Sequence, residues 1–415
     1  MRYKLLLYFV VLHSALFAQD TLRLSIGTAD SLFLKRNLLL LAEKYQIENS
    51  KAIESQTRLW DNPTLSVEFS AYNPSRGLLD VGNQGQKAIT IQQVITTAGK
   101  RNKRIALAAE ASKMSEYEFY DLLRNLKYQL RQLYFESYFL NQTVTLLDSQ
   151  LAALNTTISA FDKEFDRNNV SLKEVVRLKA LRFKLSNNRA DLLFEITDNQ
   201  RDLKSLLQTE NTIIPVVTPQ VLSRYQLTTS NTKDLEQRAL ASRSDLMMAN
   251  NLIKQSTINE QLQKALAIPD LQIGAVYDQA SNYVQNYFGV SASIDLPFFN
   301  KNQGNIKSAK SQSMYYKLNS EAKQHSIINE VDAAVKKVRI AEEAFQNVEG
   351  KFKEQFELLN RGIYDNFQKR NITMLEFIDF IESYNESILE FNRLQSDRIK
   401  VFEELNYIVG EELFN

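Results

Sequence analysis

The sequence predicts a mainly α-helical fold made of two internal repeats, each with two β-strands followed by a long helical hairpin. Proline and glycine, which interrupt helices, are absent over long stretches: no proline occurs from 75 to 214 or after 297, and no glycine from 100 to 273. Apolar residues recur every three or four positions through the first stretch. Segments of the first half also reappear in the second half, and such self-similarity indicates a repeated architecture.

The first predicted element is a cleavable secretory signal at residues 1–18. Arg2 and Lys4 form a basic start, residues 5–12 form an apolar run, and Ala18 offers a cleavage site. This run is too short to cross a bilayer as a helix. The chain contains no cysteine, so we expect export without a lipid anchor on an N-terminal cysteine.

Composition excludes several classes of function. The 415 residues carry a formal net charge of +1 and are 44% hydrophobic, which argues against a disordered chain and against a nucleic-acid partner. The absence of cysteine removes thiolate chemistry, and the two histidines are His13, in the signal, and His325. The carboxylates are scattered instead of lying at metal-ligand spacing. We therefore expect no catalytic residues, no metal site and no cofactor, and predict that the protein is not an enzyme.

The first repeat is predicted over residues 19–210, where a leading helix precedes strands at about 63–72 and 86–96. A helical hairpin then occupies about 102–210, with its tip near 167–171. Its outgoing helix carries a heptad seam made of Leu126, Leu130, Leu133, Ser137, Leu140, Val144, Leu147, Leu151, Leu154, Ile158, Phe161 and Phe165. Such a helix is roughly 90 Å long, which no compact core requires. Taken alone, this segment also fits an ordinary coiled-coil rod.

The second repeat is predicted over residues 234–415, after a linker at 211–233 that contains Pro215, Pro219 and a cluster of Thr, Ser and Asn. Its strands are expected at about 270–279 and 287–297, and its hairpin at about 302–412 with a tip near 369–373. The segment FDRNNVSLKEVV begins at 165 and FQKRNITMLEFI begins at 367, an offset of 202 residues. In both tips an Asn and a Ser or Thr suit a helix end followed by a new helix start.

The strands alternate apolar and polar residues, so each has one apolar and one polar face. Leu65, Val67 and Phe69, for example, alternate with Ser66 and Glu68. Their predicted lengths suit tilted membrane strands, although a half-buried soluble sheet shows the same alternation. Four strands cannot close a membrane barrel, because the smallest have about eight. Several chains would have to pool their strands, and the long paired helices would continue the resulting pore as a conduit.

Together these features resemble the TolC family of outer-membrane efflux proteins. The resemblance covers nearly the whole mature chain and rests on NPTLSVEFS (62–70), QVITTAGKR (93–101), SIDLPFFNKNQGNIKSAK (293–310) and RNITMLEFIDF (370–380). The second and third motifs are most similar to the branch that exports heavy-metal cations. The resemblance implies a homotrimer with a twelve-stranded β-barrel in the outer membrane, contacting its lipid, and an α-helical barrel through the periplasm. It also implies contact between the tips and a periplasmic adaptor protein, which links the duct to an inner-membrane pump of the resistance-nodulation-division type.

The resemblance also assigns roles to residues at the hairpin tips. Acidic residues that face the pore in the family correspond here to Glu376 and Asp379, and the equivalent positions of the first repeat hold Glu174 and Arg177. We expect these four residues to form a periplasmic gate, although charges at such spacing also suit a solvated helix face. The expected adaptor contacts are the turn residues, which we expect to be exposed: Asn168, Asn169, Val170, Ser171, Asn371, Ile372 and Thr373. Where the family has a glycine in the second turn, this chain has Arg370 or a neighbour of it.

The predicted function is therefore the passive exit duct of a tripartite efflux pump, with heavy-metal cations as the cargo. Two alternatives remain open at this level. The same duct would serve a type I protein secretion system or a drug pump, since the channel itself changes little between them. A secreted coiled-coil scaffold would explain the long helices but would leave the alternating strands without a purpose.

Overall fold

The computed structural model describes residues 21–83, 85–227, 231–282, 284–348 and 352–414. The predicted signal at 1–18, with His13, lies outside the described residues. The chain divides into two compact units. We call the first the helical unit (Met1–Leu41, Asp121–Arg243 and Ser326–Asn415) and the second the strand unit (Ala42–Tyr120 and Ser244–His325).

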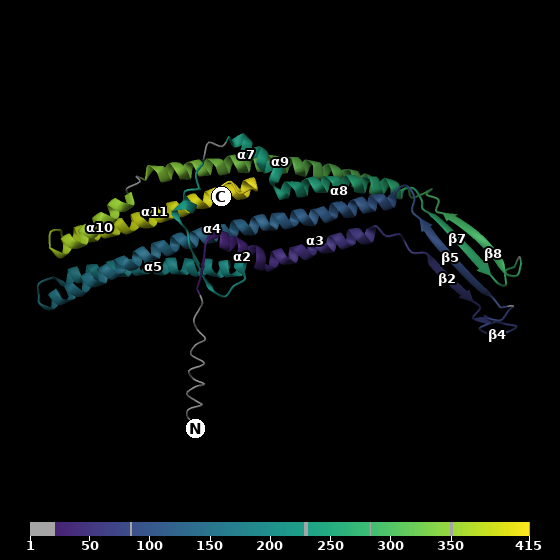
Figure 1. The fold of residues 1–415 in the computed structure, drawn as a ribbon, viewed down its shortest axis with the longest axis horizontal. Coiled ribbons are helices and arrows are strands. Elements are labelled where there is room, and N and C mark those ends of the chain that lie inside the picture. Colours follow the sequence, from purple (N-terminus) through teal and green to yellow (C-terminus); the bar gives the residue numbers. More distant parts are fainter. Residues whose placement is uncertain (1–20, 84, 228–230, 283, 349–351, 415) are drawn as a thin grey trace, which may run out of the picture. The chain divides into compact units, whose positions relative to one another are not determined.

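The strand unit contains a four-stranded antiparallel sheet in the order β2-β5-β7-β8. Its strands are β2 (Thr64–Phe69), β5 (Lys87–Ile95), β7 (Leu271–Asp278) and β8 (Tyr287–Ile294), which lie side by side in Figure 1. Each lies inside a predicted range and is shorter than that range, most of all the edge strand β2, which has six residues. Two short strands, β3 (Tyr72–Asn73) and β4 (Gly77–Leu78), pair within the connection from β2 to β5.

In both repeats one long helix precedes the strands in the sequence and another follows them. In the first repeat α3 (Leu38–Thr57) precedes the strands and α4 (Lys100–Asp166) follows them; in the second, α8 (Ser244–Leu266) precedes and α9 (Gln303–Asn347) follows. Short polar contacts join each pair inside the strand unit. The hydroxyl groups of Ser50 and Ser115 lie 2.7 Å apart between α3 and α4, and the hydroxyl of Ser320 lies 2.8 Å from Asn250 Oδ1 between α9 and α8.

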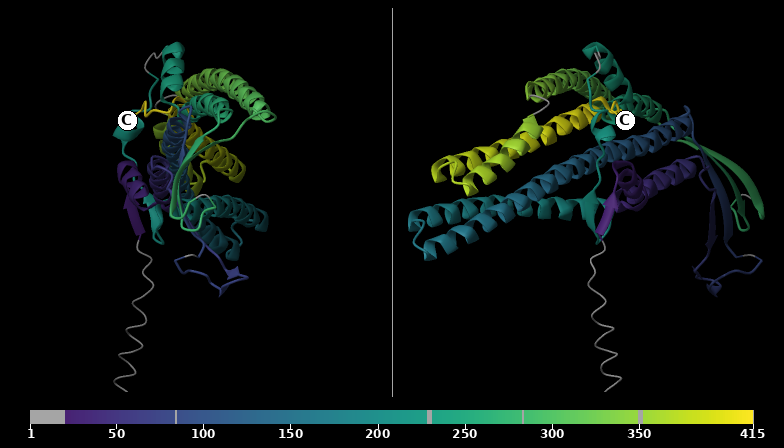
Figure 2. Two further views of the ribbon diagram at one scale, coloured as in Figure 1. Left: turned by 90° about the vertical axis from the view of Figure 1, so that its right-hand side faces the viewer. Right: turned by 60° about the vertical axis from the view of Figure 1, so that its left-hand side comes forward.

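The helical unit contains two hairpins that run side by side, as both views in Figure 2 show. The first joins α4 to α5 (Leu172–Leu207), and the second joins α10 (Phe352–Gln368) to α11 (Met374–Val409). Near their tips the hairpins share one apolar core, made of Leu147, Leu154, Ile158, Leu178, Leu181, Leu185, Phe367, Met374, Phe377 and Ile381. Most of the heptad seam is buried, so it forms part of a helix-bundle core. The prediction of a mainly helical fold is confirmed.

The outgoing helix of the second repeat differs from that of the first. The sequence predicts an unbroken helix in both, and α4 indeed runs through 67 residues. In the second repeat α9 ends at Asn347 and a separate helix, α10, begins at Phe352. Among the described residues, no helix is both long enough and apolar enough to cross a membrane.

Several short elements of the helical unit have no counterpart in the prediction. Strand β1 (Thr21–Leu24) pairs in parallel with β6 (Thr212–Pro215), so part of the segment predicted as a linker is a strand. Short helices complete the unit: α2 (Ile26–Arg36), α6 (Pro219–Leu222) and α7 (Thr232–Ser242). Strands of four residues contain too few alternations to be recognised from periodicity.

Candidate functional site

The register of the sheet gathers its apolar residues on one face. Val67 lies opposite Ile89, Ile89 opposite Tyr277, and Tyr277 opposite Phe288. Because residues directly opposite each other project to the same side, these four form one apolar row across the sheet. The other members of this face are Leu65, Phe69, Ile91, Ile95, Leu271, Ile273, Ala275, Val290, Ala292 and Ile294, together with Lys87 and Gln93.

The opposite face is polar or small at nearly every position. It consists of Thr64, Ser66, Glu68, Ala88, Thr90, Gln92, Val94, Gln272, Gly274, Val276, Asp278, Tyr287, Gly289, Ser291 and Ser293. In the single chain the apolar face is largely uncovered: Val290 is 83% exposed, Phe288 71% and Leu65 64%. An apolar surface of this extent marks contact with a membrane or with another protein.

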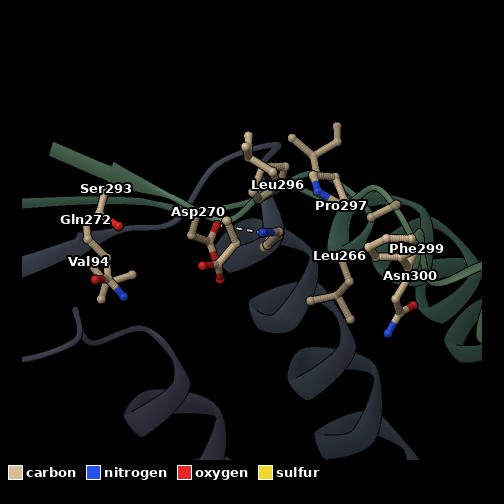
Figure 3. Close-up of a pocket in the computed structure, with 14 residues that line it drawn as sticks. Val94, Leu266, Asp270, Gln272, Ser293, Leu296, Pro297, Phe299 and Asn300 are labelled. Atoms are coloured by element: carbon tan, nitrogen blue, oxygen red, sulfur yellow. Dashed lines mark hydrogen bonds and ion pairs between the residues drawn. The ribbon is translucent and has the colours of Figure 1, made fainter.

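A pocket of about 560 Å³ lies where the strands meet the helices of the strand unit (Figure 3). Its floor holds an ion pair between Lys100 Nζ, which is buried, and Asp270 Oδ1, at 2.6 Å. The backbone N–H of Thr97 donates to the same Asp270 oxygen at 2.8 Å. This pair ties the start of α4 to the start of β7, so it fixes how strand gives way to helix. Lys100 belongs to the motif QVITTAGKR, whose lysine therefore has a structural role that the sequence alone did not assign.

The two hairpin tips have the same backbone conformation. Asn168 and Arg370, at equivalent positions, are both left-handed, with φ of +59° and +61°. In each tip the N–H of the following asparagine donates to a backbone carbonyl five residues earlier, at 2.9 Å: Asn169 to Glu164, and Asn371 to Asn366. This left-handed turn is a common way to end a helix. Arg370 therefore adopts the turn that a glycine would adopt more easily.

Each returning helix begins with a capping box. The side chain of Ser171 accepts from the N–H of Glu174, whose carboxylate accepts from the N–H of Ser171 at 2.7 Å. Thr373 and Glu376 repeat this arrangement with the same 2.7 Å distance. The backbone hydrogen bond, followed by the hydroxyl one, lowers the pKa of both glutamates. Two of the four predicted gate residues are thus engaged in helix capping.

The other two predicted gate residues are exposed on the helices that follow the tips. Arg177 and Asp379 occupy equivalent positions on α5 and α11. Within the described part of this one chain, neither Glu376 nor Asp379 forms an ion pair with Arg177. The ion pairs between α5 and α11 lie further along, where Lys184 Nζ is 3.1 Å from Glu382 and 3.4 Å from Glu386.

The expected adaptor residues divide into two groups. Asn168, Asn169, Ser171, Asn371 and Thr373 are exposed. Val170 and Ile372 are half-buried, so describing them as exposed turn residues is wrong. Each immediately precedes a helix N-cap, a position from which apolar side chains pack back on the first turn of the helix. Ile372 accordingly packs against the core that the two hairpins share.

At the opposite end of the hairpins, each repeat has a polar joint between a short and a long leading helix. Asn37, between α2 and α3, donates through Nδ2 to the carbonyl of Leu206 at 3.0 Å. Arg243, between α7 and α8, donates to the carbonyl of Ile408 at 3.3 Å and also pairs with Glu330. Leu206 and Ile408 are 202 positions apart and occupy the last turns of α5 and α11. Both joints satisfy helix carbonyls that would otherwise lack a donor.

A buried ionic cluster, which was not among the features expected from the sequence, lies near these joints. Arg131 of α4 contacts Asp30 at 2.8 Å, Glu403 of α11 at 3.2 Å and Glu412 at 3.1 Å. The hydroxyl of Tyr225 donates to Glu403, and burial raises the pKa of that tyrosine. The cluster joins α2, α4 and α11 with the segment between α6 and α7, which contains Tyr225, and with the segment after α11, which contains Glu412. Its one sequence signal is Glu403, a charge placed among the apolar residues of α11.

Among the residues that the structure describes, no group of three His, Asp or Glu side chains is placed to hold a metal ion. Polar features of the helical unit instead serve caps, joints and ion pairs between helices. The two-faced sheet and the paired tips are therefore the two features that call for a function.

Comparison with known proteins identifies the class. Residues 235–360 match the family model described as outer membrane efflux protein. No curated protein matches the sequence. Among solved structures, 93% of the chain aligns with 92% of CusC, from a study of transmembrane channel formation, with a TM-score of 0.77 and 15% identity. The CmeC outer membrane channel of Campylobacter jejuni aligns over 93% and 85% of the two chains (TM-score 0.76, 13% identity). The open-state MtrE outer membrane channel of Neisseria gonorrhoeae aligns over 93% and 89% (TM-score 0.72, 16% identity).

The described chain thus has the fold of outer-membrane channels. The match to the outer membrane efflux protein model covers residues 235–360, and over the rest of the chain the likeness is one of fold. The family resemblance drawn from the sequence is confirmed. Proteins of this family are channels, and on that ground the prediction that the chain is not an enzyme is confirmed as well.

Proposed function

We propose that this protein is the outer-membrane exit duct of a tripartite efflux pump and conducts its cargo passively. The observation that carries the proposal is the register of the sheet, which places apolar residues from all four strands on one uncovered face and polar residues on the other. A wall between lipid and a water-filled pore requires this division of faces.

The sheet also supports assembly as a homotrimer. Each strand is antiparallel to its neighbour, so the edge strands β2 and β8 run in opposite directions. A β8 edge can therefore pair with the β2 edge of another copy and continue the antiparallel pattern. Three copies would close a barrel of twelve strands, an even number as in bacterial barrels, and no open edge would remain in lipid.

The helical hairpins would continue this pore through the periplasm and present their tips to an adaptor protein. Their shared core and matched caps hold both tips of one chain in the same conformation. We assign adaptor contact to the exposed residues Asn168, Asn169, Ser171, Asn371 and Thr373, with Val170 and Ile372 supporting the turns from beneath. The adaptor would couple the duct to an inner-membrane pump of the resistance-nodulation-division type.

The periplasmic gate belongs to the same proposal. In a trimer, the exposed Asp379 would supply three carboxylates near the tips, and Arg177 would supply three guanidinium groups at the equivalent positions of the other hairpin. Glu376 and Glu174 would contribute less free charge, because their carboxylates are held in capping boxes. A ring of carboxylates favours cations and repels anions.

Single-channel recording tests the gate. Asp379→Asn should raise conductance or weaken cation preference, whereas Asp198→Asn, on an exposed part of α5 distant from the tip, should leave both unchanged. Unchanged conductance and selectivity in Asp379→Asn would remove this residue from the gate.

Heavy-metal cations are the cargo that we propose. The support is the similarity of QVITTAGKR and LPFFNKNQGNI to the metal-exporting branch of the family. Selectivity for the metal would reside in the pump and the adaptor. Deleting the gene should lower the tolerance of the host to copper, zinc or cobalt salts; a loss of tolerance to drugs alone would move the protein to the drug-efflux branch.

Membrane fractionation tests the duct itself. The full chain is expressed in a two-membrane bacterium, the membranes are separated by density, and the fraction containing the protein is cross-linked. We expect a cross-linked trimer in the outer membrane. A soluble monomer or rod in the periplasm would contradict the proposal and favour a coiled-coil scaffold.

A further inference from the structure

The polar face of the sheet carries charge at one level only. Within the four strands, all of which the structure describes, the acidic residues of this face are Glu68 and Asp278, and the face has no Lys or Arg. The register places both on the same row: Glu68 lies opposite Ala88, Ala88 opposite Asp278, and Asp278 opposite Tyr287. The remaining rows hold only Ser, Thr, Gln and small or aliphatic residues.

This row lies at the loop end of the sheet. Glu68 is the second-last residue of β2, and Asp278 is the last residue of β7, directly before the connections that lead back into β5 and β8. The helices attach at the other end of every strand. In the proposed duct this row therefore lies at the outer mouth, at the far end of the pore from the periplasmic gate.

The two carboxylates do not form a binding site for one ion. One strand, β5, lies between them, so two inter-strand spacings place their backbones about 10 Å apart. Asp278 is held in place by Gln86 Nε2 at 3.0 Å and by the N–H of Ala280 at 3.2 Å, both neutral donors that leave the negative charge uncompensated. Glu68 is exposed. Lys87, directly before Ala88 in sequence, belongs to the row of Phe69 on the apolar face.

A neighbouring residue shapes the same part of the wall. The side chain of Tyr287 lies along the polar face over Gly289, since a Cβ atom at Gly289 would come within 2.6 Å of the Tyr287 hydroxyl oxygen. The phenol ring thus occupies the row beneath the charges, and any larger residue at 289 would displace it. This side of the pore is narrowed by an uncharged ring while the charges remain at the rim.

We propose that Glu68 and Asp278 form a second charge filter of the channel, at its outer mouth. The inference rests on the proposed trimeric duct, because only three copies would place six carboxylates around one level of the pore. A pore wall of low dielectric constant focuses their field, which concentrates cations and repels anions. The filter acts strongly at 0.1 M salt, where the screening length of about 10 Å matches the spacing of the carboxylates, and weakly at 1 M, where that length is about 3 Å.

The test is the reversal potential of the purified full-length channel in a planar bilayer under a KCl gradient. The double variant Glu68→Gln, Asp278→Asn removes the charges with little change of shape. We expect it to lower the cation-to-anion permeability ratio by at least about two-fold near 0.1 M KCl, with a smaller change near 1 M. The matched controls are Gln92→Asn, on the same face two rows away, and Lys87→Gln, on the opposite face; both should leave the ratio close to that of the wild type.

The outcomes separate the filter from the duct. If the wild-type chain forms channels and the double variant has the same reversal potential, the filter is wrong and the duct stands. If the wild-type chain forms no channel, the duct fails and the filter fails with it. Should the double variant not assemble, Glu68→Gln alone decides, because this exposed side chain needs no partner to fold, and it should shift the ratio in the same direction by a smaller amount.

Discussion

In the helical unit, the two hairpin tips have nearly the same hydrogen bonds but different charged residues. Both tips have a left-handed residue, an asparagine bonded five residues back and a capping box with matching distances. Three residues beyond each box, the first repeat has Arg177 and the second has Asp379. The backbone that reverses the chain tolerates little change, whereas an exposed helix position accepts either sign of charge. One duplicated backbone frame therefore supports two hairpins of different charge.

The bases of the hairpins show a second difference. The joint of the first repeat uses the neutral Asn37, and that of the second uses Arg243 paired with Glu330. On the returning helices, Arg201 of α5 is exposed, whereas Glu403, 202 positions later on α11, is buried in the ionic cluster. Buried charges therefore stabilise the base of the second hairpin. We expect the free energy of unfolding to fall more when one of these charged residues is replaced than when an exposed charge of the first repeat is replaced.

The largest expected effect is the loss of Arg131. Arg131→Met would leave Glu403 buried without its cation and Asp30 with only the more distant Lys127, at 3.8 Å, and breaking a buried pair in this way costs about 3–5 kcal/mol. The midpoint of urea unfolding, followed by circular dichroism of the helices, should fall accordingly.

The matched control is Arg201→Met, which removes an exposed arginine from two surface ion pairs, with Asp198 and Asp202. Surface pairs contribute at most about 1 kcal/mol. If the midpoint of urea unfolding fell equally in the two variants, the buried cluster would stabilise the fold no more than a surface pair. The proposed difference between the bases of the two repeats would then be wrong.

The features that the two repeats share are also the features that could be predicted from the sequence. The helices, strands and tips follow from patterns that recur along the chain: long stretches without proline or glycine, alternation in the strands, and the match between residues 165–176 and 367–378. The capping boxes were within reach, because Ser171 and Glu174, like Thr373 and Glu376, have the spacing of that motif.

Features that depend on side chains far apart in sequence could not be predicted. Arg131 meets Glu403 across 272 residues and Tyr225 meets Glu403 across 178, and no local pattern links such partners. The exposure of single residues could not be predicted for a related reason: turns are usually exposed, whereas Val170 and Ile372 are half-buried. Their burial depends on the first turn of the following helix and on the neighbouring hairpin.

The next effect in size tests the equality of the two tips. Ser171→Ala and Thr373→Ala each remove an N-cap side chain, which costs about 1 kcal/mol. Hydrogen exchange at the N–H groups of Glu174 and Glu376 should accelerate roughly five-fold in the respective variant.

Ser186→Ala, in the exposed middle of α5, is the control and should not accelerate exchange at either tip. If exchange accelerated clearly at one tip and not at the other, the two caps would not stabilise their helices equally, although they are alike in geometry.

The smallest effect concerns the left-handed residue of each tip. A left-handed conformation costs most L-residues about 1–2 kcal/mol, but asparagine adopts it more readily. Arg370→Gly should relieve that strain, and the greater freedom of glycine in the unfolded chain offsets about 0.5–1 kcal/mol of the gain. We therefore expect a net stabilisation of under about 1 kcal/mol for Arg370→Gly and none for Asn168→Gly, measured as shifts of the thermal midpoint. If Asn168→Gly stabilised as much as Arg370→Gly, asparagine would hold no advantage over arginine in this turn. The first tip would then be as strained as the second, and the divergence of the repeats would be confined to charge.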